Sequence, residues 1–178
     1  MYIGLISDTH GFFDSPLMDF LKPVDEIWHA GDFGGLETAR KIAAFKPLRG
    51  VYGNCDGQDL RFEYPQFQLF GCCGMKVLMT HIGGYPGRYD PRARALIDEH
   101  HPDIFVCGHS HILRVVNDRK RNMLVVNPGA AGVQGFHIVR TALRFHIDDG
   151  KIHDMEVYEL DRNVSGKNDK QDKDIWRQ

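Results

Sequence analysis

The chain has 178 residues, 42% of them hydrophobic, and its formal net charge is -2. This length predicts one domain, or one domain with a tail, and the apolar content allows a real core and excludes global disorder. The charge lacks the strong basic excess of a dedicated nucleic-acid-binding protein, so no nucleic-acid partner is expected.

The N-terminal run, residues 1–7, is apolar and has no basic leader. It is too short for a signal peptide or a membrane span. The four cysteines contain no CxxC pair, so neither a zinc knuckle nor a disulfide framework is indicated. We therefore expect a cytoplasmic protein without a membrane partner.

The first third of the chain predicts strands that alternate with helices. Apolar runs that stop at polar loops predict short strands over residues 1–7, 26–30 and 48–52. Ser15 and Pro16 are typical of a helix start, and apolar spacing predicts a second helix over residues 36–45. This alternation indicates an α/β fold.

The remainder is richer in predicted strands. A helix over residues 92–100 follows a predicted loop, residues 83–91, and the strands are expected at residues 66–70, 76–80, 104–107, 114–116, 123–126, 137–140, 142–147 and 152–158. The order of elements predicts a layered α/β fold with sheet packed on sheet. We place one domain at residues 1–160 and a polar tail at 161–178, in which Ile175 and Trp176 are the only candidates for docking.

Five of the predicted strands end in short loops that carry side chains able to bind a metal. These residues are Asp8, His10, Asp32, Asn54, His81, His109 and His111. The carboxyl ends of strands form the ligand crevice in α/β sheets, so we expect these donors to converge. Glycines beside several of them, Gly31, Gly53 and Gly108, allow the backbone to approach closely.

Seven donors exceed the roughly four that one tetrahedral ion needs. Two divalent ions that share a bridging carboxylate fit the number better, and such ions lie about 3.5–4 Å apart. Mixed nitrogen and oxygen donors favour manganese, iron, zinc, cobalt or nickel over a soft-metal site, and affinity alone does not choose among them. Of these, manganese is the expected cofactor.

The same residues fall into five motifs in order. They are Ser7-Asp8-Thr9-His10, Gly31-Asp32, Gly53-Asn54-Cys55-Asp56, Thr80-His81 and Gly108-His109-Ser110-His111. In this the chain resembles the calcineurin-like metallophosphoesterases, and most of all their YfcE-type phosphodiesterase branch. The likeness extends over residues 1 to about 160 and includes Asn127-Pro128-Gly129. It implies a four-layer α-β-β-α sandwich of two mixed β-sheets flanked by helices.

The resemblance also implies roles for the seven residues. Asp8, His10 and His111 would hold the first metal, Asn54, His81 and His109 the second, and Asp32 would bridge the two. Asp32, Asn54 and His81 are also the expected catalytic residues. The implied reaction is hydrolysis of a small-molecule phosphate ester by a hydroxide that lies between two divalent metals.

One departure from the family pattern concerns the leaving group. Many members have a histidine directly after the motif asparagine, where it can donate a proton, but this chain has Cys55. Loss of a general acid costs about 10²–10⁴-fold for a poor leaving group. This favours activated esters or diesters over alkyl monoesters. Ile82 replaces the usual glycine after His81, and alanines follow Gly129; neither change removes a ligand.

The other histidines have plainer interpretations. His29 is expected to be packed or to support the site, and His100 and His101 to end a helix. His137, His146 and His153 fall on late predicted strands, where surface positions are expected.

Several further residues are interpreted as structural. Cys55 is expected to be a spacer, Asp56 a turn residue with a back-up proton donor as the minority interpretation, and the pair Cys72-Cys73 incidental. For Arg88 a solvated side chain is favoured over a phosphate contact.

Alternatives of other classes stay open. The fold also resembles Vps29, a protein-interaction scaffold, and such scaffolds tend to lose metal ligands, which this chain has not done. A phosphomonoesterase or a nuclease is a further alternative. The sequence does not specify the natural substrate or the native metal, and it leaves a homo-oligomer open.

Overall fold

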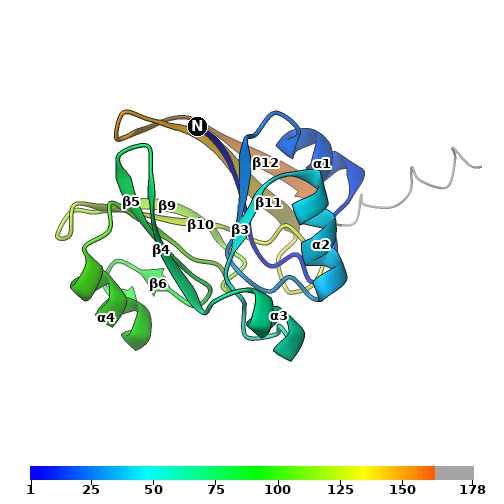
Figure 1. Cartoon of the computed structure of the whole chain (residues 1–178), viewed down its shortest axis with the longest axis horizontal. Helices are drawn as coiled ribbons and strands as arrows, with labels where there is room; N and C mark the ends of the chain where they lie inside the picture. Colours follow the sequence, from blue (N-terminus) through cyan, green and yellow to red (C-terminus); the bar gives the residue numbers. More distant parts are fainter. Residues whose placement is uncertain (163–178) are drawn as a thin grey trace, which may run out of the picture.

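The computed structural model describes residues 1–162, and Figure 1 shows how their strands and helices are arranged. Within these residues a first five-stranded sheet has the order β12-β11-β1-β2-β3. Its strands are β1 (Tyr2–Ile6), β2 (Glu26–His29), β3 (Leu48–Gly50), β11 (Val139–Asp148) and β12 (Lys151–Asp161). β1, β2 and β3 are parallel, whereas β11 runs antiparallel to both β1 and β12.

A second five-stranded sheet within the same residues has the order β4-β5-β8-β10-β9. Its strands are β4 (Phe67–Cys72), β5 (Met75–Thr80), β8 (Ile104–Val106), β9 (Leu113–Asp118) and β10 (Met123–Pro128). The central strands β5, β8 and β10 are parallel, and the edge strands β4 and β9 are antiparallel to their neighbours. Both sheets are therefore mixed.

The two sheets pack face to face around a common apolar core. Alternate residues of each strand face this core, for example Ile3 and Leu5 from β1, and Val77 and Met79 from β5. The Trp28 ring makes edge contacts with Phe70 of the second sheet at 5.1 Å and with Phe145 at 6.1 Å. Residues from both sheets thus share one buried cluster, which fixes the sheets relative to each other.

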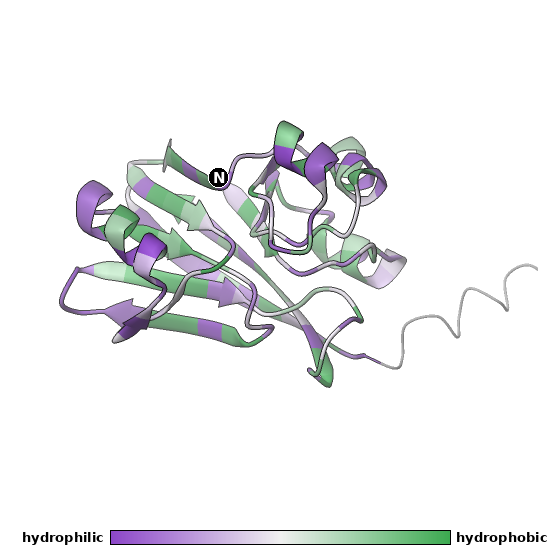
Figure 2. Ribbon diagram, turned by 90° about the horizontal axis from the view of Figure 1, so that it is seen from below, coloured by the Kyte–Doolittle hydropathy of each residue, from purple (hydrophilic) through white to green (hydrophobic). Residues whose placement is uncertain are grey.

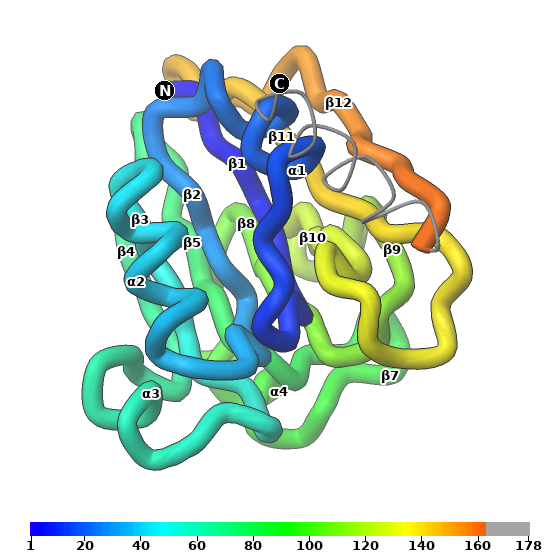
Figure 3. Tube along the Cα trace, turned by 90° about the vertical axis from the view of Figure 1, so that its right-hand side faces the viewer, coloured from blue at the N-terminus to red at the C-terminus, as the bar shows by residue number. Residues whose placement is uncertain are grey.

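Helices cover the outer faces of the sheets. α1 (Ser15–Leu21) and α2 (Leu36–Phe45) pack on the outward residues of the first sheet, such as Ile6 and Ile27. Figure 3 shows these helices in front of β1, β2 and β3, and Figure 2 shows hydrophobic residues along many of the strands. α4 (Pro91–His100) packs through Ala93 and Ile97 on the second sheet. The result is the expected four-layer α-β-β-α sandwich.

Three local predictions were wrong. α3 (Gln58–Glu63) occupies a segment for which no helix was predicted, because a helix of six residues in which only Leu60 is buried shows no apolar periodicity in the sequence. A two-stranded ribbon, β6 (Gly84–Tyr85) and β7 (Arg88–Tyr89), lies within the predicted loop 83–91. The strands expected at 137–140 and 142–147 form the single strand β11, which begins at Val139.

A buried ion pair ties the first helix to β11. The Arg140 side chain is fully buried and its guanidinium donates two hydrogen bonds to Asp14, of 2.9 and 2.8 Å. A third bond, of 2.7 Å, goes to the carbonyl of Ala131. The charge of this arginine is therefore fully partnered where water cannot reach it.

No helix in residues 1–162 is long and apolar enough to cross a bilayer. The predicted tail, with Ile175 and Trp176, lies outside the described residues apart from residues 161 and 162.

Candidate metal centre

The predicted donors follow the carboxyl ends of strands from both sheets. Asp8 and His10 come after β1, Asp32 after β2 and Asn54 after β3. His81 directly follows β5, and His109 and His111 follow β8. Because β1, β2 and β3 are parallel to one another and β5 is parallel to β8, each sheet directs these loops to one end.

One group forms around Asp8, whose side chain is completely buried. Its Oδ2 accepts a hydrogen bond of 3.1 Å from the backbone N–H of His109. Its Oδ1 accepts no hydrogen bond within the described residues, although Nε2 of His111 lies 3.2 Å away. Nε2 of His10 lies 3.5 Å from that same nitrogen. The donor atoms of Asp8, His10 and His111 all lie within 4.8 Å of one another.

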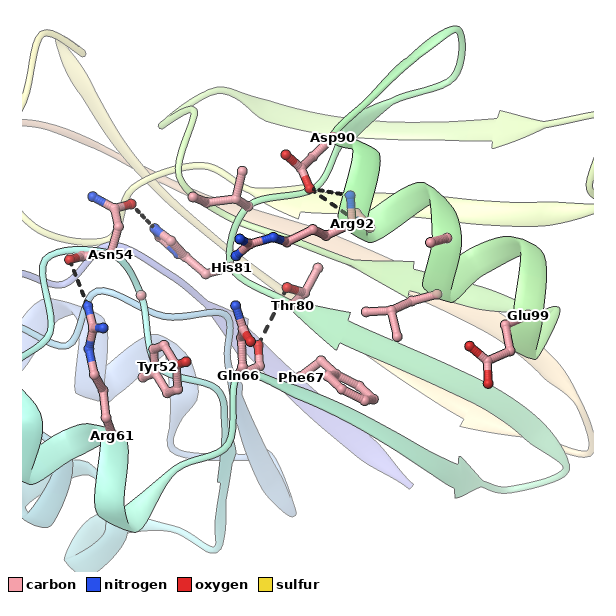
Figure 4. Close-up of a pocket in the computed structure, with 15 residues that line it drawn as sticks. Tyr52, Asn54, Arg61, Gln66, Phe67, Thr80, His81, Asp90, Arg92 and Glu99 are labelled. Carbon is pink, nitrogen blue, oxygen red and sulfur yellow. Dashed lines mark hydrogen bonds between the residues drawn. The ribbon is translucent and has the colours of Figure 1, made fainter.

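A second group forms around Asp32 and His81. Nδ1 of His81 lies 2.8 Å from the carbonyl oxygen of Ala30, so in the neutral ring this nitrogen is the donor. Nε2 then carries a lone pair, and it points at Asn54 Oδ1 at 3.1 Å and at Asp32 Oδ2 at 3.3 Å. Figure 4 shows the Asn54–His81 contact.

Asp32 lies between the two groups. Its Oδ2 is 3.3 Å from Nε2 of His81 and 3.9 Å from Nε2 of His10, and Oδ1 accepts a bond of 2.8 Å from the N–H of Cys55. Burial raises the pKa of Asp32, but the contacts with His81 and Cys55 outweigh it and hold the pKa far below its ordinary value. The carboxylate is therefore ionised, and it lies near candidate metal ligands of both groups, His10 and His81.

His109 enters the cluster from the side. Its ring centroid is 5.2 Å from that of His81, and burial together with the neighbouring His81 lowers the pKa of His109. The ring is therefore neutral near pH 7 and offers a lone pair, as a metal ligand must.

These lone pairs and carboxylates need a positive charge between them. Burial lowers the pKa of His81, but Asp32 and Asp8 outweigh it and raise the pKa above its ordinary value. Either a proton or a cation can therefore neutralise this cluster. In the other group, Oδ1 of Asp8 lies beside His111 and has no hydrogen-bond partner within the described residues, so a positive charge would stabilise this oxygen as well. The residues present thus fit divalent cations.

The backbone at the cluster is strained. Five of the seven predicted ligands have positive φ: Asp8 (53°), His10 (46°), Asp32 (57°), His109 (66°) and His111 (57°). This left-handed region is unfavourable for residues other than glycine, and such strain is concentrated at functional sites.

Glycines allow the loops to approach as closely as the sequence predicted. A Cβ on Gly53 would lie 2.0 Å from Oδ1 of Asp32, and one on Gly31 would lie 2.6 Å from Nδ1 of His81. A Cβ on Gly108 would lie 2.9 Å from Oδ2 of Asp8. Any larger residue at these positions would displace a donor.

The prediction of a surface position for His137 was wrong, because this half-buried histidine supports His111. Nε2 of His137 lies 3.0 Å from the carbonyl oxygen of Gly132, so it is the donor, and Nδ1 is left as an acceptor. Nδ1 of His111 lies 3.2 Å from that acceptor and must carry its own proton toward it. This chain of bonds leaves Nε2 of His111 unprotonated and facing Asp8. The lone histidine in a loop gave no sequence signal.

His29 is a packed supporting residue, as expected. Its ring is fully buried and stacks on Phe33 at 3.7 Å. Nδ1 accepts a bond from the N–H of Gly31, and Nε2 lies 2.9 Å from Oγ1 of Thr9. Burial lowers the pKa of His29 to about 3. The neutral ring therefore holds the β1 and β2 loops together.

The two residues after Asn54 are also structural. Asp56 is buried and its oxygens accept bonds from the N–H groups of Gly34 and Gly53, at 3.1 and 2.8 Å. These bonds fit the turn residue that the sequence favoured. Cys55 is exposed, and burial and Asp32 raise the pKa of its thiol above the ordinary value.

Two cavities flank the cluster. One of about 550 Å³ is lined by Asn54 and His81, together with Arg61 and Arg92. One of about 240 Å³ is lined by His109. The sequence interpretation missed both cavity arginines and considered Arg88, which lines neither of these cavities.

Comparisons with known proteins identify the family of this chain. A family model described as the calcineurin-like phosphoesterase superfamily domain matches residues 1–150. The chain belongs to this superfamily. A probable metallophosphoesterase of Methanothermobacter thermautotrophicus is 30% identical over 140 residues, which are 75% of this chain and 78% of the relative.

Solved structures share the fold. Zinc-bound Vps29 from Entamoeba histolytica has a TM-score of 0.67 at 19% identity, with 92% of this chain and 100% of that chain covered. A predicted phosphoesterase of Streptococcus pneumoniae has a TM-score of 0.64 at 24% identity, with 91% and 90% covered. The family relationship and the fold agree with the resemblance found in the sequence.

Proposed function

We propose that this chain is a binuclear metal-dependent phosphodiesterase that hydrolyses a small-molecule phosphate diester. The observation that carries the proposal is the convergence of lone pairs around Asp32. Two oxygens lie close to Nε2 of His81: Oδ1 of Asn54 at 3.1 Å and Oδ2 of Asp32 at 3.3 Å. Such a group of acceptors is stable only with positive charge between them.

In this proposal Asp8, His10 and His111 hold one ion, and Asn54, His81 and His109 hold the other. Asp32 contributes to both, which fits its position between His10 and His81. When bound, two such ions generate hydroxide near neutral pH and neutralise the oxygens of a phosphoryl group. The mixed nitrogen and oxygen donors favour manganese, with iron, zinc, nickel or cobalt as alternatives.

The chain itself would contribute position and polarity to the reaction. The His137–His111 bond fixes one ligand, and the Ala30 carbonyl fixes His81. Cys55, a protonated thiol of raised pKa, replaces the histidine that could protonate a leaving group. Substrates with good leaving groups are therefore favoured over alkyl monoesters.

A diester rather than a monoester is favoured by the two cavities. Both are lined in part by Ile82 and Asp90, and one is also lined by His81 and the other by His109. A phosphate diester has two organic arms, and each arm would have a cavity of its own.

The test is hydrolysis of bis-p-nitrophenyl phosphate with manganese, nickel, cobalt or zinc. Asp32→Asn should reduce turnover by at least about 10²-fold, because the bridging charge is lost. Asp19→Asn, an exposed carboxylate change on α1, is the matched control and should keep wild-type turnover. Wild-type turnover by the Asp32 variant, or no turnover with any of the four metals, would overturn the proposal.

A protein-interaction scaffold is the second candidate. The observation in its favour is the edge strand β9, where Val115 and Val116 are 43% and 36% exposed, preceded by Ile112 at 56%. Exposed apolar edges are typical of surfaces that pair with another chain. Retained metal binding without hydrolysis of any diester would favour this candidate.

A further inference from the structure

The larger cavity beside Asn54 and His81 is a candidate binding site in its own right (Figure 4). Its walls come from α3, the start of β4, the end of β5 and the face of α4. Its volume of about 550 Å³ falls within the range of roughly 300–1,000 Å³ that is typical of small-molecule sites. A phosphoryl group alone would leave most of this space empty.

Arg92 brings to this cavity a positive charge that has no close ion-pair partner within residues 1–162, although Asp90 and Glu99 also line the cavity. It lies in the first turn of α4, where its backbone N–H bonds to the capping carboxylate of Asp90. Figure 4 shows its side chain extending toward His81. Within residues 1–162 its guanidinium has no carboxylate within 4.0 Å, whereas Arg94 on the same helix pairs with Asp98 at 3.5 Å. A free guanidinium beside the candidate metal centre is suited to a phosphate oxygen.

The second arginine of the cavity, Arg61, already has partners within the protein. Nε of Arg61 donates to the carbonyl of Asp56, Nη2 donates to the carbonyl of Asn54, and the guanidinium lies 4.9 Å over the Tyr52 ring. Arg61 therefore supports the loop of Asn54, and Arg92 is the arginine that remains available for a ligand.

The rest of the cavity combines an apolar surface with a polar edge. Phe67 is 39% exposed although it lies on a strand, and Leu96 of α4 also lines the cavity. The amide of Gln66 lies beside Phe67 and has no hydrogen-bond partner within the described residues. An aromatic face next to an amide is suited to a flat ring with hydrogen-bonding groups on its edge, as in a nucleobase.

We infer that this cavity binds the nucleoside arm of a nucleotide diester, an inference that rests on the proposed phosphodiesterase function. The base packs against Phe67 and Leu96, and its edge faces Gln66. Arg92 binds a non-bridging oxygen of the scissile phosphate. The second arm of the diester lies toward the smaller cavity, beside His109.

Two synthetic diesters test this assignment: the p-nitrophenyl ester of thymidine 5′-monophosphate and methyl p-nitrophenyl phosphate. In each, the oxygen of water bonds to phosphorus, the P–O bond to p-nitrophenolate breaks, and the proton of water passes to solvent. The wild type should prefer the thymidine ester by at least about 10-fold in kcat/KM, because base stacking on an aromatic ring contributes substantially to binding.

Three variants separate the contributions. Phe67→Ser should abolish most of this preference by lowering kcat/KM for the thymidine ester. Arg92→Met should lower kcat/KM about 10-fold for both esters. Arg94→Met, two residues further along α4 and outside the cavity lining, should change neither.

The outcomes distinguish the two proposals. If the methyl ester is hydrolysed but the thymidine ester is not preferred, or if Phe67→Ser keeps the preference, the nucleoside assignment is wrong and the phosphodiesterase stands. If neither ester is hydrolysed, calorimetric titration with thymidine 5′-monophosphate decides. Binding that is lost in Phe67→Ser and Arg92→Met supports the site without catalysis, and absent binding overturns it.

Discussion

Replacement of His137 by phenylalanine should weaken one metal site and leave the other intact. The phenyl ring keeps the size of the imidazole and its edge contact with His111, whose ring centroid is 5.1 Å away. It removes the acceptor that fixes the proton of His111 on Nδ1. The proton can then move to Nε2, the nitrogen that faces Asp8 and would bind the ion.

The size of the effect follows from what is lost. One net hydrogen bond is worth about 1 kcal/mol, or roughly fivefold in affinity. Freedom of the tautomer adds to this, and substitutions of groups that orient metal ligands typically cost about 10–100-fold. We therefore expect roughly tenfold weaker binding at the site of His10 and His111.

Titration with manganese, with the free ion followed by electron paramagnetic resonance, measures this directly. His101→Asn, a change at an exposed histidine that caps the end of α4 and belongs to none of the possible metal-binding groups in the described residues, is the control and should bind as the wild type does. His137→Asn returns an acceptor near the position of Nδ1 and should recover part of the loss. Two unchanged sites in His137→Phe would show that the proton of His111 is fixed in another way.

Three further changes test the structure around the site. Gly53→Ala should lower the free energy of unfolding by about 1–3 kcal/mol and reduce activity, because its Cβ would lie 2.0 Å from Asp32 Oδ1. Gly71→Ala is the control, because a Cβ there meets open space. Denaturant unfolding and turnover measurements compare the two variants. Asp14→Ala leaves its fully buried arginine partner unpaired and should cost about 3–5 kcal/mol in urea unfolding. Burial holds the pKa of His29 at about 3, below its ordinary 6.5, so the unfolded chain binds protons preferentially between these values. Stability should therefore fall by up to about 1.4 kcal/mol per pH unit below pH 6.5, and less steeply in His29→Gln.

The pattern of apolar runs predicted the layered α/β arrangement and the donors at strand ends for local physical reasons, whereas the four layers were implied by the family resemblance. A strand that is buried on both faces has an unbroken apolar sequence, such as the one before Asp8. The polar residue that follows such a run is therefore easy to identify. His10 and His111 lie 101 residues apart, yet each follows a buried strand, and their Nε2 atoms lie 3.5 Å apart. The strand-end pattern thus predicted that these loops would meet, and the family resemblance implied which of them share a site.

The cavity could not be read in the same way. Arg92 reaches it because α4 packs on the second sheet through Ala93 and Ile97, and neither residue signals where the adjacent arginine will point. Phe67 was expected simply as a strand residue, and its exposure depends on the position of an edge strand. Such surfaces arise from tertiary packing and not from a local pattern.

His137 illustrates the difference between residues that a local sequence pattern predicts and residues whose role depends on tertiary packing. A ligand must occupy a fixed place at a strand end, so its position in the sequence is constrained, but a residue that orients it can come from any loop that passes nearby. His137 lies 26 residues beyond His111 in a segment without regular structure. Its role depends on one carbonyl, that of Gly132, which decides which of its nitrogens is a donor. The state of the proposed first metal site is therefore set by a backbone group outside all five motifs.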